Sequence, residues 1–270
     1  MVNYAWSEEK ITKFIKQGRG SGEFGEYKPW LTVRDVPSTG RESRIKGKKT
    51  NRKHQLLSDL EKKAFVIYDW NDCVIDIREQ YPILERDKTR EIAEILGFNH
   101  PKYPKTNILT VMTFDFLITS KSNTGEVYTY ARSIKPFTKL LDERVVEKLL
   151  IEKYYAEQQN IDWGLITDKE IPDVLVRNLL DLRDIDYNIN EENSEILVYC
   201  LTHILNTDQS NRVIDTIVTL SQNLSMDQED VIIIIKYLIV NKHLNYNLMT
   251  RMNFHRQIWQ DVLNGGVDRA

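Results

Sequence analysis

Two charged residues lie inside segments that otherwise consist of strand-forming residues. Residues 112–118 are MTFDFLI, with Asp115 at the centre, and residues 128–136 are YTYARSIKP, with Lys135 near the end. The polar stretch SKSNTGE between them favours a hairpin turn, which would bring both charges to the open end of two antiparallel strands. A buried carboxylate and a buried ammonium are costly apart and tolerated together. The spacing therefore predicts that Asp115 and Lys135 lie roughly opposite each other.

A third candidate is Glu61, at the end of the segment SDLE. The pattern matches a capping box, in which Glu61 would simply cap a helix. A helix packed beside the sheet would also let Glu61 face Asp115. Two carboxylates can hold Mg²⁺ through oxygen ligands, the metal can activate water at a phosphodiester, and the lysine can stabilise developing charge. Two interpretations stay open on these residues alone: a metal-dependent nuclease site, or a structural ion pair beside a helix cap.

Positive charge is concentrated near the N-terminus of a chain whose formal net charge is −3. Residues 1–55 contain 13 Lys/Arg and 6 Asp/Glu, whereas residues 169–270 contain 9 Lys/Arg and 15 Asp/Glu. The basic excess peaks in the segment RESRIKGKKTNRKH, which fits contact with a phosphate backbone or, alternatively, a solvated loop. The predicted DNA-binding residues are Arg41, Arg44, Lys46, Lys48, Lys49, Arg52 and Lys53.

Hydrophobic periodicity predicts a mixed α/β sheet with flanking helices over residues 1–170. The order after residue 56 is helix, strand, helix, two strands, helix and strand, and the last crossover can be parallel. The basic segment is expected to be a loop. Expected helices cover 7–18, 56–70, 87–97 and 142–159, and expected strands cover 30–33, 74–84, 108–119, 127–135 and 162–167.

The C-terminal part has a different pattern. Three successive helices are expected within residues 195–243, followed by a short strand or wing at 244–254. Helices with a terminal wing are typical of a winged helix, so we predict a linker at 171–190 and a winged-helix domain at 191–270. The acidic balance of this part opposes DNA contact and favours a protein partner.

Several classes of protein are not supported by the sequence. No stretch approaches the roughly 20 apolar residues that span a bilayer, and the N-terminus lacks the order of a signal peptide. The only two cysteines, Cys73 and Cys200, are far apart and are expected to be reduced thiols. We therefore expect a protein of the cytosol with no membrane association.

Longer segments resemble a known family. YKPWLTVRDVPSTGRESRIKGKKTNRKHQLLSDLEKKAF, DIREQYPIL, TFDFLI, IKP, LDERVVEKL and TDKEI are similar, in order and spacing, to the TnsA family. Members are endonuclease subunits of heteromeric cut-and-paste transposases. The resemblance extends from about Ser7 to about Ile171, and it implies a restriction-endonuclease-like fold with a winged-helix C-terminal domain.

The resemblance also implies roles for particular residues. The catalytic glutamate, aspartate and lysine of the family fall on Glu61, Asp115 and Lys135. A family glutamine falls on Ser133, which is a departure, because a hydroxyl is a poorer Mg²⁺ ligand than a carboxylate. The metal is then expected to take the main-chain carbonyl of Ile134 together with Glu61 and Asp115, and Ser133 is a doubtful ligand.

The implied activity is a Mg²⁺-dependent cut at the 5′ ends of a transposon in a bacterial cytosol. A TnsB-like transposase would cut and join the 3′ ends, and a TnsC-like ATPase regulator would contact the C-terminal domain. Two alternatives remain at this point. One is a stand-alone restriction or repair nuclease of the same fold, and the other is a non-catalytic assembly factor that bridges its partners to transposon-end DNA.

Overall fold

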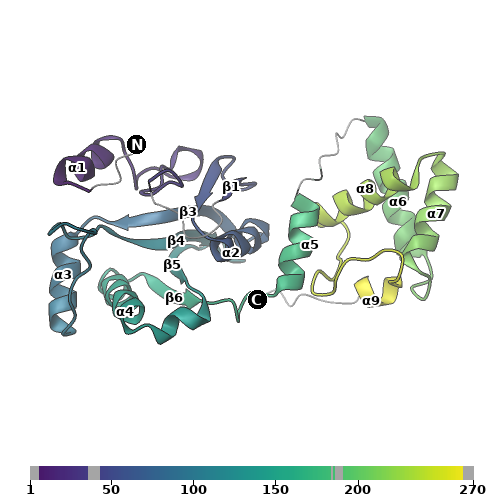
Figure 1. Cartoon of the computed structure of the whole chain (residues 1–270). Helices are drawn as coiled ribbons and strands as arrows, with labels where there is room; N and C mark the ends of the chain where they lie inside the picture. The colour runs from purple at the N-terminus through teal and green to yellow at the C-terminus, as the bar shows by residue number, and fades with distance from the viewer. Residues whose placement is uncertain (1–5, 36–42, 184, 186–190, 264–270) are drawn as a thin grey trace. The chain divides into compact units, whose positions relative to one another are not determined.

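The computed structural model describes residues 6–35, 43–183, 185 and 191–263, and the chain divides into two units (Figure 1). The first unit is Met1–Ile171 and the second is Pro172–Ala270. The boundary falls close to the predicted end of the first domain. The predicted linker at 171–190 differs from the structure, because it contains helix α5 (Asp173–Arg183), which belongs to the second unit.

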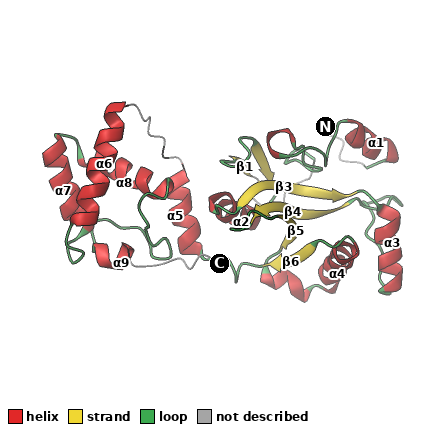
Figure 2. Ribbon diagram, turned by 180° about the vertical axis from the view of Figure 1, so that it is seen from behind, coloured by secondary structure: helices red, strands yellow, loops and turns green. Residues whose placement is uncertain are grey.

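A four-stranded mixed sheet forms the centre of the first unit (Figure 2). Its order is β3-β4-β5-β6, with antiparallel pairs up to β5 and a parallel pair between β5 and β6. Helix α4 makes the crossover that the sequence predicts. The strands are β3 (Val74–Ile83), β4 (Met112–Lys121), β5 (Val127–Ile134) and β6 (Asp162–Ile166), and α4 is Glu143–Gln158.

The main core lies between this sheet and helices α3 (Arg86–Ile95) and α4. Apolar residues spaced along one side of each helix meet the apolar side chains of β3, β4 and β5. The buried members of this cluster are Ile83, Ile92, Ala93, Met112, Phe114, Leu117, Ala131, Ile151, Tyr155 and Ala156. Burial of this surface fixes the strands that carry Asp115 and Lys135.

A second, smaller cluster holds the N-terminal helix α1 (Glu8–Lys16) to the sheet domain. Ser7 caps α1 by accepting a hydrogen bond from the Lys10 N–H. Phe14 and the fully buried Trp30 pack edge to face in this cluster. The expected strand at 30–33 is not formed, and this segment is a bend and turn. The described part of the unit also contains two short 3₁₀ helices, η1 (Phe24–Glu26) and η2 (Phe137–Leu141), and helix α2 (Asp59–Trp70).

The basic segment is a β-hairpin and not the expected loop. Strand β1 (Ser43–Lys46) pairs antiparallel with β2 (Lys53–Leu56). Exposed and more buried side chains alternate along both strands, so that only one face of the hairpin packs against the protein. The many Lys and Arg residues of the segment hide this alternation in the sequence. Gly47 begins its turn, where an added Cβ would lie 2.6 Å from Nε2 of the buried His54.

In its described residues, the second unit contains α5 and four further helices. They are α6 (Glu191–Asn206), α7 (Val213–Leu224), α8 (Gln228–Val240) and α9 (Trp259–Leu263). The three predicted helices are present, but residues 244–254 form turns and no strand. Within the described part of this unit, β pairing is limited to an isolated bridge between Arg212 and Ile258. The predicted winged helix is therefore not confirmed. None of the described helices is long and apolar enough to cross a membrane.

We predict that Gly47→Ala destabilises the first unit by about 1–3 kcal/mol, the usual cost of forcing an extra methyl group into a packed site. The new Cβ would collide with His54 and with Thr50 Oγ1, which lies 2.7 Å from its position. Urea unfolding followed by circular dichroism measures the loss. Gly25→Ala is the control, because its Cβ would be 3.4 Å from the nearest atom. Equal stability of the two variants would contradict the prediction.

Candidate active site

The carboxylate of Asp115 and the ammonium of Lys135 meet directly. Lys135 Nζ donates to Asp115 Oδ2 at 2.6 Å and to the Ile134 carbonyl oxygen at 3.0 Å. The Ile134 N–H donates to the same Asp115 oxygen at 2.6 Å. Asp115 is buried, whereas one third of the Lys135 side chain is exposed. The structure thus brings together the two charges that the sequence predicts to pair.

An interruption in the sheet makes room for this pair. The pairing of β5 with β4 ends at Arg132, opposite Phe116, but its pairing with β6 continues to Ile134. The Ile134 N–H is therefore free to bond the Asp115 side chain. Lys135 is held at the end of β5 because its own N–H donates to the Ile166 carbonyl at 3.1 Å. The separation of the two strands gives the Asp115 carboxylate a buried polar environment between β4 and the end of β5.

Glu61 both caps helix α2 and lies within electrostatic range of Asp115. Its N–H donates to Ser58 Oγ at 3.1 Å, and its carboxylate accepts from the Leu57 N–H at 2.9 Å and from Ser58 Oγ at 3.0 Å. Burial, and then the charge of Asp115, raises the pKa of the Glu61 carboxyl to about 7. The two interpretations of Glu61 are not exclusive, since one carboxylate serves the cap and faces the cluster.

The lysine is surrounded by more acids than the sequence suggested. Burial would lower the pKa of Lys135, but the neighbouring Asp115, Glu152 and Glu61 outweigh burial and raise it. Burial and the charge of Asp115 raise the pKa of Glu152 to about 7, although Lys135 opposes the shift. One ammonium therefore faces three carboxyl groups, which is more negative charge than it neutralises.

Glu152 also binds the hydroxyl group of Ser133. Ser133 Oγ donates to Glu152 Oε2 at 2.5 Å and accepts from Trp163 Nε1 at 3.2 Å, and Ser133 is fully buried. Its hydroxyl is thus engaged with α4 and β6. Sequence reasoning missed Glu152, whose position on an amphipathic helix resembles that of any other acidic residue. The signal that could have found it is its spacing, because Glu152 stands three residues after Leu149 and three before Tyr155, both of which are buried on α4.

Gln80 of β3 is the other residue that sequence reasoning missed. Its Nε2 donates to Glu61 Oε2 at 3.4 Å, and its Oε1 accepts from Thr113 Oγ1 at 3.3 Å. The side chain is buried between helix α2 and strand β4. Gln80 therefore belongs to the polar surroundings of Glu61.

The oxygen atoms of the cluster suit a hard divalent cation. Asp115, Glu61 and the Ile134 carbonyl are the kind of ligand that Mg²⁺ prefers. The ammonium of Lys135 already bonds two of these oxygen atoms, which shows that a positive charge is accommodated there. Among the described residues no group of three or more His, Cys, Asp or Glu side chains is arranged to hold a metal. A metal at this site would therefore need the main-chain carbonyl or water as further ligands.

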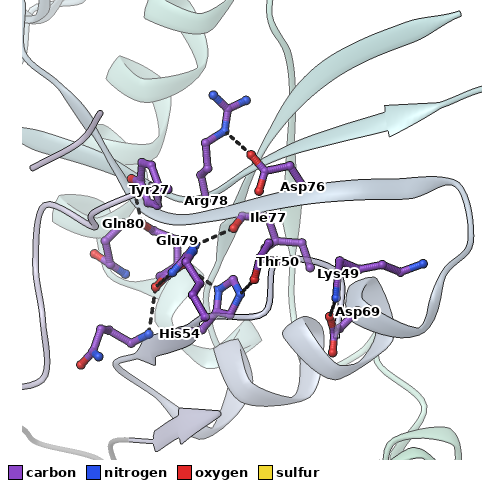
Figure 3. A network of polar contacts seen from close by, with 12 residues as sticks. Tyr27, Lys49, Thr50, His54, Asp69, Asp76, Ile77, Arg78, Glu79 and Gln80 are labelled. Carbon is purple, nitrogen blue, oxygen red and sulfur yellow. Dashed lines mark hydrogen bonds and ion pairs between the residues drawn. The ribbon is translucent and has the colours of Figure 1, made fainter. Parts of the chain in front are cut away.

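A buried polar network fixes the basic hairpin beside this cluster (Figure 3). The fully buried Glu79 accepts from Arg52 Nη1 at 2.8 Å, from Arg52 Nη2 at 2.5 Å and from the Gln55 N–H at 2.9 Å. Its Oε2 also lies 2.8 Å from Nδ1 of the buried His54. Burial would raise the pKa of Glu79, but His54 and Arg52 lower it to about 2.

Arg52 was predicted to contact DNA, but in the structure its guanidinium group bonds within this network. Four of its guanidinium hydrogen bonds go to Glu79, the Ile77 carbonyl and the Phe24 carbonyl, and 8% of its side chain is exposed. Arg52 therefore anchors the hairpin from within. Arg41 lies outside the described residues.

The outward face of the hairpin carries three of the predicted cations. Lys46 lies across from Lys53 in the register, and Arg44 is two residues along on the same face. All three are exposed. Lys48 and Lys49 lie in the turn, where their N–H groups donate to the Asp69 carboxylate of α2 at 2.9–3.1 Å. Asp69 thus fixes the turn at the same helix that carries Glu61.

A mixed sheet with a carboxylate–lysine cluster where two strands separate, and a basic hairpin beside it, defines a nuclease-like α/β protein. Comparisons with known proteins agree with this class. The family described as "TnsA-like endonuclease N terminal" matches residues 71–168. The transposon Tn7 transposition protein TnsA of Escherichia coli is 41% identical over 216 residues, which cover 79% of this chain and 77% of that protein. The chain belongs to the TnsA family.

The raised pKa of Glu61 predicts a stability difference that depends on pH. A carboxyl whose pKa rises from 4.5 to about 7 on folding lowers the stability as pH increases between those values. Glu61→Gln removes this loss. The unfolding temperature of the variant minus that of the wild type should therefore increase as the pH rises from about 4.5 to 7. Thermal unfolding followed by circular dichroism measures the difference.

The control for this measurement has the opposite sign. An ion pair with Arg86 lowers the pKa of the exposed Glu8, so Glu8→Gln should be the less stable protein above about pH 4.5. A difference between Glu61→Gln and wild type that stays constant from pH 4.5 to pH 8 would contradict the prediction.

Proposed function

We propose that this chain is a Mg²⁺-dependent DNA endonuclease subunit of a cut-and-paste transposase and that it cuts the 5′ ends of the transposon. The observation that carries the proposal is the meeting of Asp115, Lys135 and Glu61 at the separated ends of β4 and β5. Membership of the TnsA family supports the same activity. These three residues also argue against a non-catalytic assembly factor, because such a protein would not require charges to be buried in the sheet.

Each residue of the cluster has a definite part in this activity. Glu61, Asp115 and the Ile134 carbonyl would hold Mg²⁺, which when bound activates water and polarises the scissile phosphate. Lys135 keeps its positive charge because of the acids around it, and its partly exposed ammonium can donate to a phosphate oxygen. Ser133 has no part in holding the metal, since its hydroxyl bonds Glu152 and Trp163.

The outward cations of the hairpin would bind the DNA backbone. Arg44, Lys46 and Lys53 share one exposed face, and the opposite face is buried against the domain through His54 and Leu56. The network around Glu79 prevents this basic surface from moving independently of β3. Phosphate contacts fix the position of a protein on DNA without reading its sequence. The hairpin would therefore align a strand with the catalytic cluster.

We further propose that the enzyme works with a TnsB-like transposase and a TnsC-like ATPase. The relative is named as a Tn7 transposition protein. In this chain, residues 169–270 have an excess of acidic residues, 15 against 9 basic residues, which opposes DNA and suits a protein partner. Helix α6 also exposes apolar side chains, Val198 and Leu205 among them. We assign the ATPase contact to this second unit.

We predict that Asp115→Asn abolishes 5′-end cleavage. The isosteric amide removes the charge that holds both Lys135 and the metal, while its oxygen can still accept from the Ile134 N–H. Strand-specific nicking of labelled transposon-end DNA, with and without the TnsB-like and TnsC-like partners, measures the effect. Cleavage at the 3′ ends should continue in the complete mixture.

Asp87→Asn is the matched control, because its side chain on α3 is 88% exposed and lies outside the proposed site. It should cut like the wild type. Normal 5′ cleavage by a folded Asp115→Asn protein would refute the proposed site. Cutting by the wild-type protein without any partner would instead favour a stand-alone nuclease.

The hairpin predicts a change in the salt dependence of DNA binding. Replacing Arg44, Lys46 and Lys53 by Gln should weaken binding and reduce the slope of log K against log salt by about 0.9 for each lost phosphate contact. Fluorescence anisotropy with duplex DNA between 50 and about 200 mM salt measures the slope.

The control replaces Arg90 of α3 and Lys153 of α4 by Gln. This change removes two exposed positive charges from elsewhere on the same unit. This variant should keep the wild-type slope, although it changes net charge in the same direction. An unchanged slope in the hairpin variant would show that these cations do not touch the phosphate backbone.

A further inference from the structure

Gln80 adopts a backbone conformation that is unusual for its position. Its φ is +49°, although it lies inside β3 and carries a full side chain. The pairing of β3 with β4 continues on both sides, through Glu79 with Phe116 and Tyr81 with Phe114, so Gln80 lies across from Asp115. A left-handed conformation carries an energetic cost for a residue other than glycine. Such a cost persists where something else requires it.

The left-handed residue changes the direction of a side chain. Successive side chains of a regular strand point to opposite faces. Here Glu79 bonds Arg52 and His54, and its neighbour Gln80 bonds Glu61 on α2. Figure 3 shows Glu79 and Gln80 on the same side of the strand, with Arg78 on the other. The strand therefore presents two consecutive polar side chains to α2 and the hairpin.

The amide of Gln80 is held at both ends. Thr113 Oγ1 of β4 donates to Gln80 Oε1 at 3.3 Å, which directs Nε2 to Glu61 Oε2 at 3.4 Å. The same Glu61 oxygen accepts from the Leu57 N–H at 2.9 Å. A continuous chain of hydrogen bonds thus joins the strand of Asp115 to the helix of Glu61.

We propose that Gln80 is a positioning residue that holds the Glu61 carboxylate toward Asp115, and that the strained backbone of β3 is retained for this purpose. The inference rests on the proposed function, in which Glu61 and Asp115 share a metal ion. A glutamine that only fills space in a strand would not need a left-handed backbone, and a glycine would adopt the same backbone without strain. The amide itself is therefore the group that requires the conformation.

Gln80→Gly distinguishes the effect of the side-chain amide from that of the backbone strain. The variant lacks the amide, and glycine adopts the positive φ of this position without strain. We expect Mn²⁺, used as the probe, to bind this variant about tenfold more weakly than the wild type in calorimetric titration, which is the usual effect of losing a group that orients a ligand. The Mn²⁺ concentration for half-maximal cleavage should rise by the same factor, and the rate at saturating Mn²⁺ should largely recover.

A second measurement needs neither metal nor cleavage. Amide hydrogen exchange at Leu57 reports the bond that its N–H makes to Glu61 Oε2. Exchange should be faster in Gln80→Gly, because the carboxylate is no longer held from the sheet side. Thr113→Val should weaken Mn²⁺ binding in the same direction, and the double variant should lose no more than Gln80→Gly, since both act through one chain of bonds.

Asn160→Gly is the matched control, because Asn160 also has a positive φ, +55°, in an exposed turn. It should leave Mn²⁺ affinity and Leu57 exchange unchanged. Wild-type Mn²⁺ affinity together with wild-type Leu57 exchange in Gln80→Gly would overturn the proposal. A wild-type protein that binds no Mn²⁺ would refute the proposed metal-dependent function, and Leu57 exchange would still decide the role of Gln80.

Discussion

An aspartate and a lysine on adjacent strands of a packed sheet are tolerable only if their charges meet, because each alone would lose its hydration without compensation. In this protein the meeting of Asp115 and Lys135 depends on where β5 leaves β4. If pairing continued past Arg132, the Ile134 N–H would bond a β4 carbonyl and not the carboxylate. The parallel strand β6 keeps β5 straight beyond that point through Ile166. The crossover topology and the ion pair are thus parts of one arrangement.

The two acidic centres of the first unit have opposite charge balance. At Glu79 the contacts with His54 and Arg52 favour the ionised carboxylate, and its pKa falls to about 2. At Glu61 burial and a neighbouring carboxylate raise the pKa to about 7. The first centre is neutralised within the chain and holds a hairpin in place. The second retains uncompensated repulsion that a cation can relieve, which is a property of functional sites more than of structural ones.

Much of the first unit follows from local sequence. Charges within apolar strands predict the pair of Asp115 and Lys135, and the capping pattern that ends at Glu61 predicts a helix start, which the structure has at Asp59 after the cap Ser58. Gln80 was beyond prediction, because a left-handed glutamine has no sequence signal and arises from tertiary contacts. The partner of Arg52 was hidden for a related reason: a basic run suggests solvent, whereas Glu79, 27 residues away, draws one arginine into the interior. In the second unit, turns at 244–254 replace the expected wing.

The position of the cluster along the chain has a consequence for biosynthesis. Glu61, Asp115 and Lys135, and the strand β6 that steadies them, all precede Ile171. Domains fold as units during synthesis, the N-terminal one first. The residues of the proposed catalytic cluster are therefore all translated before the second unit, and they can come together while that unit is still being synthesised. If the second unit binds the partners as we propose, the order of synthesis leaves no interval in which the partner contact exists without the proposed cleavage site, so control of cleavage would reside in the finished cluster or in its dependence on assembled partners.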